Sequence, residues 1–449
     1  MRKLLPLIIG LTLGGVHLAH ADDLAQIYNQ AKENDPQLLR AKADRDASFE
    51  AIDSSRGDLL PQINLTAGYN VGRNIRTRNN DHATSNGANA GEQNVFSTGL
   101  NVSQEIYNRA SWVNLDIAEQ NARQQDSAYA ASQQEMILRV SEAYFAVLQA
   151  QDNLTFIQAE KKAVGRQLEQ TKQRFDVGLS AITDVHDAQA QYDSVLADEI
   201  LAQNDVTNSY EALREITGQN HKDLSILDTA RFSTSLPQSN QDALVNEAQE
   251  KNLDLLTARI AQDIAKSNIS LAKSGFTPSL SLDGGYQYSD VDEHNDSSGL
   301  NNYTSNDYDI GINLVIPIYQ GGSTTADVKT AQYQYVSASE QLEQTYRGVT
   351  KNVRAYYNNI NAAIGSIRAY EQSVVSAQSA LEATEAGYEV GTRTIVDVLD
   401  ATRRLYDSNR QLSDARYNYV ISVLQLKQAV GTLSEQDIID INAGLKRPS

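Results

Sequence analysis

Residues 63–71 read Ile-Asn-Leu-Thr-Ala-Gly-Tyr-Asn-Val, an alternation of apolar side chains with polar or very small ones. Three more segments, residues 96–103, 279–288 and 308–314, alternate in a similar way. Side chains along a β-strand point to opposite faces in turn, so each segment would have one apolar and one polar face. Strands of this kind, about nine or ten residues long, are typical of membrane-spanning β-barrels. Four strands are too few to close a barrel.

The composition excludes several classes of protein. The chain has 449 residues, a formal net charge of −19 and no cysteine. It therefore has no disulfide, no thiolate metal site, no thiol nucleophile and no lipid anchor on cysteine. The six histidines are scattered, so we expect no metal site, and the acidic balance disfavours nucleic acid as a partner. No phosphate loop or nucleophile motif is present, so we expect neither enzymatic activity nor a cofactor.

The first residues have the pattern of a secretory signal peptide. Arg2 and Lys3 precede an apolar core at residues 4–16, and Ala19-His20-Ala21 fits a cleavage site. We therefore expect residues 1–21 to be removed. No run of 18 apolar residues follows, so a membrane role would use strands rather than helices.

The chain contains a tandem duplication. Pro61 and Pro278 begin matching segments 217 residues apart, and Gly99 and Gly311 lie in matching segments 212 residues apart. The order of matched segments never changes. We therefore predict the following organisation: repeat 1 at 22–220, a connector at 221–240, repeat 2 at 241–435 and a C-terminal tail at 436–449.

Each repeat is predicted to contain a helix, a hairpin of two strands, a very long helix, a tight turn and a return helix. The predicted strands are about 62–72 and 95–106, then 279–290 and 307–317, joined by polar loops at 72–94 and 291–307. The predicted long helices are about 109–175 and 324–388, and the return helices about 182–217 and 395–430. A helix of about 65 residues spans roughly 100 Å, about three times the apolar thickness of a bilayer.

Two simpler interpretations fit parts of this pattern. The long helices alone fit a coiled-coil rod, and each strand pair alone fits a hairpin on a water-soluble core. The combination favours the membrane interpretation, because a soluble sandwich would need many more strands. An open sheet edge in lipid costs on the order of tens of kcal/mol, so copies of the chain must share one barrel. Two, three or four copies fit, and the small polar face favours twelve strands or more.

The most specific resemblance to a known family lies at residues 174–179, 181–185 and 386–402. These segments resemble the TolC family of outer-membrane channels, which serve Gram-negative efflux and type I secretion systems. The resemblance implies an α+β membrane protein that forms a homotrimer. Each chain would give four strands to a shared twelve-stranded outer-membrane barrel and long helices to a twelve-helix periplasmic tunnel. The connector and the C-terminal tail would lie in an equatorial region.

The resemblance also implies a function. The chain would form the exit duct of tripartite multidrug efflux pumps and of type I protein secretion, gated at its periplasmic end. Its partners would be outer-membrane lipid, a periplasmic adaptor (membrane fusion) protein and an inner-membrane RND or ABC transporter. The alternative is a trimeric periplasmic spacer or adhesin, anchored in the outer membrane without a transport role.

The helical turns are the predicted functional site. Gly178 and Gly391 fit the left-handed position that ends a helix, and Thr183 or Asp184 could cap the return helix. By resemblance, the adaptor would dock on the two tips, which comprise Val177, Gly178, Leu179, Val390, Gly391 and Thr392.

Asp397 and Asp400 are three residues apart and would share one helix face. The spacing by itself favours an acidic, solvated helix face; the resemblance favours instead an acidic ring at the gate that attracts cations and raises carboxyl pKa values. Asp184 and Asp187 form the matching pair in repeat 1. Arg403 and Arg404 follow Asp400 closely enough to pair with it, and such pairing would reduce the negative charge of the ring.

By resemblance, polar links between the hairpins hold the gate closed. These are Tyr388 with Asp184, and Arg393 with Thr183 or Asp184 of a neighbouring copy. Phe175 and Ser180 occupy the matching positions in repeat 1, so only repeat 2 can supply these groups.

Overall fold

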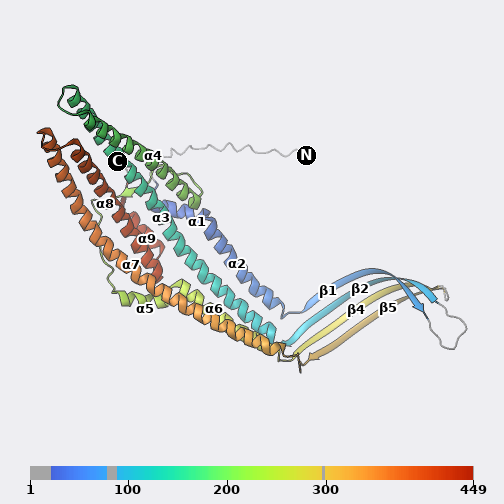
Figure 1. Ribbon diagram of the computed structural model, residues 1–449. Helices are drawn as coiled ribbons and strands as arrows, with labels where there is room; N and C mark the ends of the chain where they lie inside the picture. Colours follow the sequence, from blue (N-terminus) through green and yellow to red (C-terminus); the bar gives the residue numbers. More distant parts are fainter. Residues whose placement is uncertain (1–21, 78–87, 296–298, 448–449) are drawn as a thin grey trace, which may run out of the picture. The chain divides into compact units, whose positions relative to one another are not determined.

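The computed structural model describes residues 22–77, 88–295 and 299–447 (Figure 1). The predicted signal peptide, residues 1–21, lies outside the described residues. The helices are α1 Leu24–Asn34, α2 Pro36–Gly57, α3 Arg109–Asp176, α4 Ile182–Thr217, α5 Gln241–Lys251, α6 Leu253–Ser274, α7 Ser323–Glu389, α8 Ile395–Val430 and α9 Glu435–Asn442. The strands are β1 Gln62–Thr77, β2 Ala88–Asn108, β3 Ile226–Leu227, β4 Ser279–Asn295, β5 Gly299–Val315 and β6 Leu445–Lys446.

Each repeat begins with two helices where the sequence analysis expected one. Asp23 caps α1 by accepting a hydrogen bond from the Gln26 amide at 2.8 Å. Helix α1 ends at Asn34, and the next residue, Asp35, is extended because Pro36 disfavours a helical conformation in the residue before it. Pro36 then starts α2, where its missing N–H costs nothing. In repeat 2, the extended residue Asn252 separates α5 from α6.

The four long strands form one antiparallel sheet in the order β1-β2-β4-β5, which Figure 1 shows side by side. Two hairpins, β1–β2 and β4–β5, are joined through β2 and β4, where Leu100 lies opposite Tyr286. The ladder shifts register between Glu105 and Tyr107. Strands β1 and β5 therefore each have one edge without a strand partner among the described residues.

The strands are longer than predicted. Pairing between β1 and β2 continues to Thr77 opposite Ala88, and pairing between β4 and β5 continues to Asn295 opposite Gly299. Much of the expected polar loops at 72–94 and 291–307 is therefore sheet; residues 78–87 and 296–298 lie outside the described residues. The prediction failed because a ladder is held by backbone hydrogen bonds, which do not require alternating hydrophobicity.

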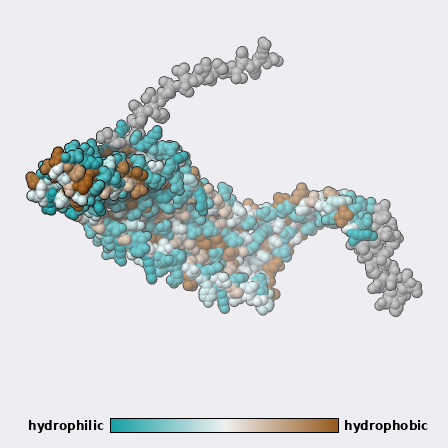
Figure 2. Space-filling model, turned by 45° about the horizontal axis from the view of Figure 1, so that its top comes forward, coloured by the Kyte–Doolittle hydropathy of each residue, from teal (hydrophilic) through white to brown (hydrophobic). Residues whose placement is uncertain are grey.

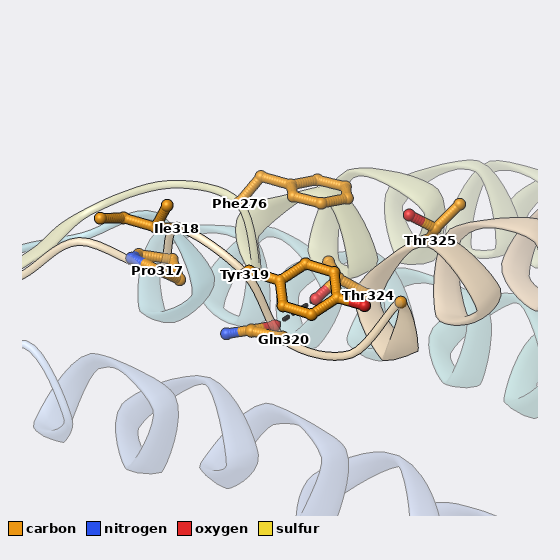
Figure 3. Close-up of a pocket in the computed structure, with 9 residues that line it drawn as sticks. Phe276, Pro317, Ile318, Tyr319, Gln320, Thr324 and Thr325 are labelled. Carbon is orange, nitrogen blue, oxygen red and sulfur yellow. Dashed lines mark hydrogen bonds between the residues drawn. The ribbon is translucent and has the colours of Figure 1, made fainter.

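The chain divides into two compact units. One, residues 41–130 and 253–347, contains the sheet and the adjoining parts of the helices. Where its strands meet its helices, a small pocket opens between the loop before β4 and the loop after β5 (Figure 3). Phe276, Ile318 and Tyr319 border it with side chains that are largely exposed, and the Thr324 hydroxyl donates to Gln320.

The described residues of the other unit, 22–40, 131–252 and 348–447, are mostly helical. The connector and the C-terminal tail meet here, because β3 pairs with β6 through Leu227 and Leu445. Helix α1 contacts α9 through a hydrogen bond of 2.9 Å from the Tyr28 hydroxyl to Glu435. Lys32 adds an ion pair of 2.5 Å to the same carboxylate. These contacts join segments from both ends of the described chain.

Within the part of the chain that the structure describes, no helix has both the length and the apolar character needed to cross a membrane.

Candidate functional site

The two helix–turn–helix tips of the helical unit follow the same backbone path. Gly178 and Gly391 have φ angles of 79° and 80°, in the left-handed region that favours glycine. The Leu179 amide donates to the Arg174 carbonyl at 2.8 Å, and the Thr392 amide donates to the Gly387 carbonyl at 2.9 Å. These bonds close a Schellman motif in each repeat, so glycine at these two positions is explained by the turn alone.

An aspartate caps the return helix at each tip. Asp397 accepts hydrogen bonds from the amide and the hydroxyl of Thr394, both at 2.9 Å, and its own amide donates to that hydroxyl at 3.3 Å. This is a reciprocal capping box. At the first tip, Ala181 has no hydroxyl, and Asp184 accepts instead from the Ala181 amide at 3.2 Å and the Ser180 hydroxyl at 2.6 Å.

The hydrogen bonds at Asp397 affect its ionisation. The backbone and side-chain donors of Thr394, with a smaller effect from the charge of Arg393, lower the pKa of Asp397 below its ordinary value of 3.8. The sequence analysis expected a ring of like charges to raise the carboxyl pKa values. Within one chain, the capping hydrogen bonds have the opposite effect, because they stabilise the carboxylate form.

One apolar core joins the four helices behind the tips. Ile395 and Val398 of α8 pack in it with Leu168 of α3 and Leu381 of α7. Ala188 of α4 completes the contact, and all five side chains are buried. The tips are therefore held by common packing, and a movement of one helix pair would disturb the other.

Tyr388 belongs to this core and has a polar partner there. Its side chain is buried, and its hydroxyl lies 3.5 Å from the hydroxyl of Thr171. The Arg174 guanidinium carbon lies 4.7 Å from the centre of the Tyr388 ring, a cation–π contact. Sequence reasoning did not predict this contact. Arg174 matches Gly387 of repeat 2, so repeat 2 has no equivalent arginine.

The predicted link between Tyr388 and Asp184 is absent among the described residues of this single chain. Tyr388 is directed to Thr171, and Asp184 is occupied by the hydrogen bonds that cap α4. Both groups are satisfied locally, which is the physical reason that they do not meet here. Thr183 is exposed at the same tip.

Arg393 is positioned by the backbone of its own tip. Its amide donates to the Gly387 carbonyl at 3.2 Å. A β-carbon at position 387 would lie only 2.7 Å from the Arg393 side-chain γ-carbon, so the glycine makes room for this arginine. Within the described residues of one chain, the Arg393 guanidinium has no hydrogen-bond partner. The Arg393 side chain is exposed at the tip.

Asp397 and Asp400 do lie on one face of α8, where they line a groove against α7. Ala377, Ala380 and Thr384 of α7 form the opposite wall. Asp400 is exposed, whereas Asp397 is half-buried. The matching residue in repeat 1, Asp187, is also exposed.

The two arginines that follow Asp400 differ in their surroundings. Arg403 lies 3.8 Å from Asp407 in an ion pair, whereas Arg404 lines the groove together with Asp397 and Asp400. Neither arginine forms an ion pair with Asp400 in the described part of the chain. The sequence allowed either arginine to pair with Asp400, whereas in the structure Arg403 pairs with Asp407 and Arg404 lines the groove.

The two tips expose large apolar side chains. Val177, Leu179 and Val390 are each about 70% exposed (69%, 70% and 75%). Figure 2 shows apolar surface at this end of the helical unit. Thr392 contributes a hydroxyl, which donates to the Gly387 carbonyl at 3.1 Å.

Farther from the tips, a polar network that sequence reasoning missed connects α3 with α8. Asp152 accepts hydrogen bonds from Ser413 at 2.5 Å and Tyr417 at 2.8 Å, and Gln149 donates to Asp414 at 2.7 Å. Burial raises the pKa of Asp414. The helical period places such residues on one face, but sequence alone does not say which helix lies opposite.

Within residues 22–77, 88–295 and 299–447, no cluster of histidine and acidic side chains is arranged to hold a metal ion.

The comparisons with known proteins agree with this architecture. The family model described as Outer membrane efflux protein matches residues 27–219 and 244–432, two stretches that follow the two repeats. The chain therefore belongs to the outer membrane efflux protein family, and it is an outer-membrane protein. The family predicted from the sequence is confirmed.

Individual relatives cover nearly the whole chain. The outer membrane protein TolC of Vibrio cholerae serotype O1 is 62% identical over 447 residues, which are 99% of both chains. The alkaline protease secretion protein AprF of Pseudomonas aeruginosa is 28% identical over 94% of this chain and 86% of its own length. The solved Campylobacter jejuni CmeC outer membrane channel superposes with a TM-score of 0.76 at 18% identity, covering 94% of this chain and 90% of that one. The predicted α+β channel fold is confirmed.

Proposed function

We propose that three copies of this chain form one channel in the outer membrane, which serves as the exit duct of tripartite multidrug efflux and of type I protein secretion. The twelve strands of three copies would close one barrel, and the long helices would form a periplasmic tunnel. The description of the family as outer membrane efflux proteins supports the efflux role, and the name of the relative AprF, a protease secretion protein, supports the secretion role.

The observation that carries the proposal is the open sheet. Strands β1 and β5 of the described chain each lack a partner on one edge, and their apolar side chains are the most exposed of the sheet. Tyr69 on β1 and Ile312 on β5 are 65% and 69% exposed, against 49% and 44% for Tyr286 and Leu100, the matching residues on the paired strands β4 and β2. Pairing β5 of one copy with β1 of the next satisfies both edges.

The duplication also predicts the register of that pairing. Within the chain, Leu100 lies opposite Tyr286 where repeat 1 meets repeat 2. Ile312 matches Leu100, and Tyr69 matches Tyr286, so Ile312 of one copy should lie opposite Tyr69 of the next. If repeat 2 of one copy meets repeat 1 of its neighbour as the repeats meet within the chain, each junction around the barrel is equivalent.

Cysteine cross-linking tests this arrangement in a chain that has no cysteine of its own. We expect Tyr69→Cys with Ile312→Cys to give covalent dimers and trimers, and nothing larger, after treatment of outer membranes with a short thiol cross-linker. The control is Tyr69→Cys with Gly311→Cys, because a shift of one residue moves the side chain to the other face. A monomer only, or products of more than three subunits, would overturn the shared twelve-stranded barrel.

The tips are proposed as the gate and as the docking surface for the periplasmic adaptor. The exposed apolar residues Val177, Leu179 and Val390 support docking, with Gly178, Gly391 and Thr392 shaping the turns. An inner-membrane RND or ABC transporter would act through that adaptor. Site-specific photo-cross-linking from Leu179 should capture an adaptor protein, whereas the same probe at the buried Leu168 should not.

The closed gate is proposed to need Arg393 with Thr183 or Asp184 of a neighbour, and Tyr388 with Asp184. The free Arg393 guanidinium supports the first link. The second link requires Tyr388 to leave Thr171, so it is proposed for the assembled closed state. Charge-assisted bonds of this kind stabilise by about 1.5–3 kcal/mol each.

Single-channel recording tests the gate. Tyr388→Phe combined with Arg393→Ser should raise the conductance in planar bilayers, because the links that favour the closed state are lost. The matched control is Phe175→Leu, at the position of repeat 1 that matches Tyr388, and it should leave conductance unchanged. An unaltered conductance in the Tyr388 and Arg393 variant would refute the assignment.

A further inference from the structure

The groove between α7 and α8 is balanced in charge. Two carboxylates, Asp397 and Asp400, share it with two guanidinium groups, Arg393 and Arg404. The remaining lining residues, Ala377, Ala380, Thr384 and Ala401, are uncharged. The charged lining groups of one chain therefore sum to zero, although the two aspartates considered alone would give the gate a strongly negative end.

The helical geometry separates Arg404 from its neighbour Arg403. At about 100° per residue, Arg404 lies roughly 20° from Asp397 around the α8 axis, between Asp397 and Asp400. Arg403 lies roughly 120° from Asp397, and it pairs with Asp407 at 3.8 Å. The two adjacent arginines thus face different surroundings, and of these two only Arg404 lines the groove with the acidic pair.

Repeat 1 has the same acidic pair without the arginines. Asp184 and Asp187 match Asp397 and Asp400, whereas Ser180 and Gln191 match Arg393 and Arg404. Since the two repeats share one backbone plan, the arginines are not required to build the tip. Their presence in repeat 2 changes the charge of that groove alone.

We propose that Arg404 determines the ion selectivity of the gate by offsetting the charge of Asp397 and Asp400. The inference rests on the proposed trimeric channel, in which three copies of this groove would surround one opening. Each Arg404 reduces the attraction of the acidic pair for cations passing or lodging there. The channel should therefore be only weakly selective for cations and weakly blocked by multivalent cations.

Planar-bilayer recording with La³⁺ in the periplasmic-side chamber tests this role. Arg404→Gln should lower the La³⁺ concentration for half-block by about tenfold at 0.1 M salt, and should raise the K⁺ over Cl⁻ permeability ratio at least about twofold. Arg404→Lys keeps the charge and should match the wild-type channel. Arg403→Gln is the control beside it and should stay within about twofold of wild type. At 1 M salt, the difference between Arg404→Gln and wild type should largely disappear.

The outcomes separate this inference from the proposed function. If the wild-type channel conducts and Asp400→Asn weakens the La³⁺ block, while Arg404→Gln behaves like wild type, the role of Arg404 is overturned and the channel stands. An equal effect of Arg403→Gln and Arg404→Gln would also overturn it, because overall charge would then explain the result. If the wild-type protein forms no channel, the proposed function fails together with this inference.

Discussion

The tip of repeat 1 and the tip of repeat 2 have the same turn but different contacts. Both end a long helix with a glycine near φ 80° and start a return helix with an aspartate cap. Repeat 1 leaves Ile182 46% exposed, whereas the matching Ile395 is 1% exposed in the shared core. The two tips share a backbone path, but among the described residues only the second combines a buried tyrosine with a mixed-charge groove.

The largest expected difference between the tips is in core packing. Ile395→Ala should destabilise the protein by about 2–5 kcal/mol, because it leaves a cavity among four helices. Ile182→Ala should cost within about 0.5 kcal/mol, since that side chain is half exposed. Guanidinium unfolding in detergent, followed by circular dichroism, measures both. Equal losses would show that the two tips are packed alike.

The two turn glycines, Gly178 and Gly391, are expected to contribute equally to the free energy of unfolding. Gly178→Ala and Gly391→Ala should each destabilise the protein by about 1–2 kcal/mol, because both force a side chain into the left-handed region. The same unfolding experiment applies to each. Gly365, a helical glycine with open space at its β-carbon, is the control, where alanine should stabilise the helix by about 1 kcal/mol. A large inequality between the two tip variants would mean that one turn changes its path in the assembly.

The caps of the return helices α4 and α8 should differ by a smaller amount in the stability that they contribute. Thr394→Ala removes the hydroxyl that caps α8 and should cost about 1 kcal/mol. Ala181→Thr supplies the missing hydroxyl to α4 and should stabilise by up to about 1 kcal/mol. Amide hydrogen exchange over the first turn of each return helix reports these effects locally. No gain from Ala181→Thr would mean that Ser180 already supplies all the hydroxyl capping that α4 can use.

The smallest expected effect is the response of α8 to acid. Because the folded state lowers the pKa of Asp397, its contribution to stability is present above the ordinary value of 3.8 and is lost as the pH falls below that value. Asp397→Asn should therefore remove the acid-dependent part of hydrogen-exchange protection at the start of α8. If Asp397→Asn loses hydrogen-exchange protection in acid as the wild type does, other carboxylates cause that loss.

Much of the fold was predictable because its signals are local and repeated. Alternation at residues 63–71 indicated a strand, glycine at 178 and 391 indicated a helix end, and constant spacing between matched segments revealed the duplication. The strand ends were wrong, since backbone pairing continues through Thr77 and Ala88 without an apolar pattern. The break before Pro36 was also missed, although proline supplied a local signal for it.

The candidate site was less predictable than the fold. Spacing placed Asp397 and Asp400 on one face, but it did not show that Thr394 engages Asp397 or that Arg404 lines a groove of α7 and α8 together with the two acids. Arg174 was missed because its contact with Tyr388 joins residues 214 positions apart.

The sequence by itself determined the repeat, the strand and helix types, the turn glycines and the family. These depend on backbone preferences and side-chain periodicity, which act over a few residues. Only the tertiary structure decided which helix faces meet, which of two adjacent arginines enters the groove, and which partner Tyr388 takes. Those outcomes depend on the packing of α3, α4, α7 and α8 against one another, and packing fixes distances between residues that no local pattern connects.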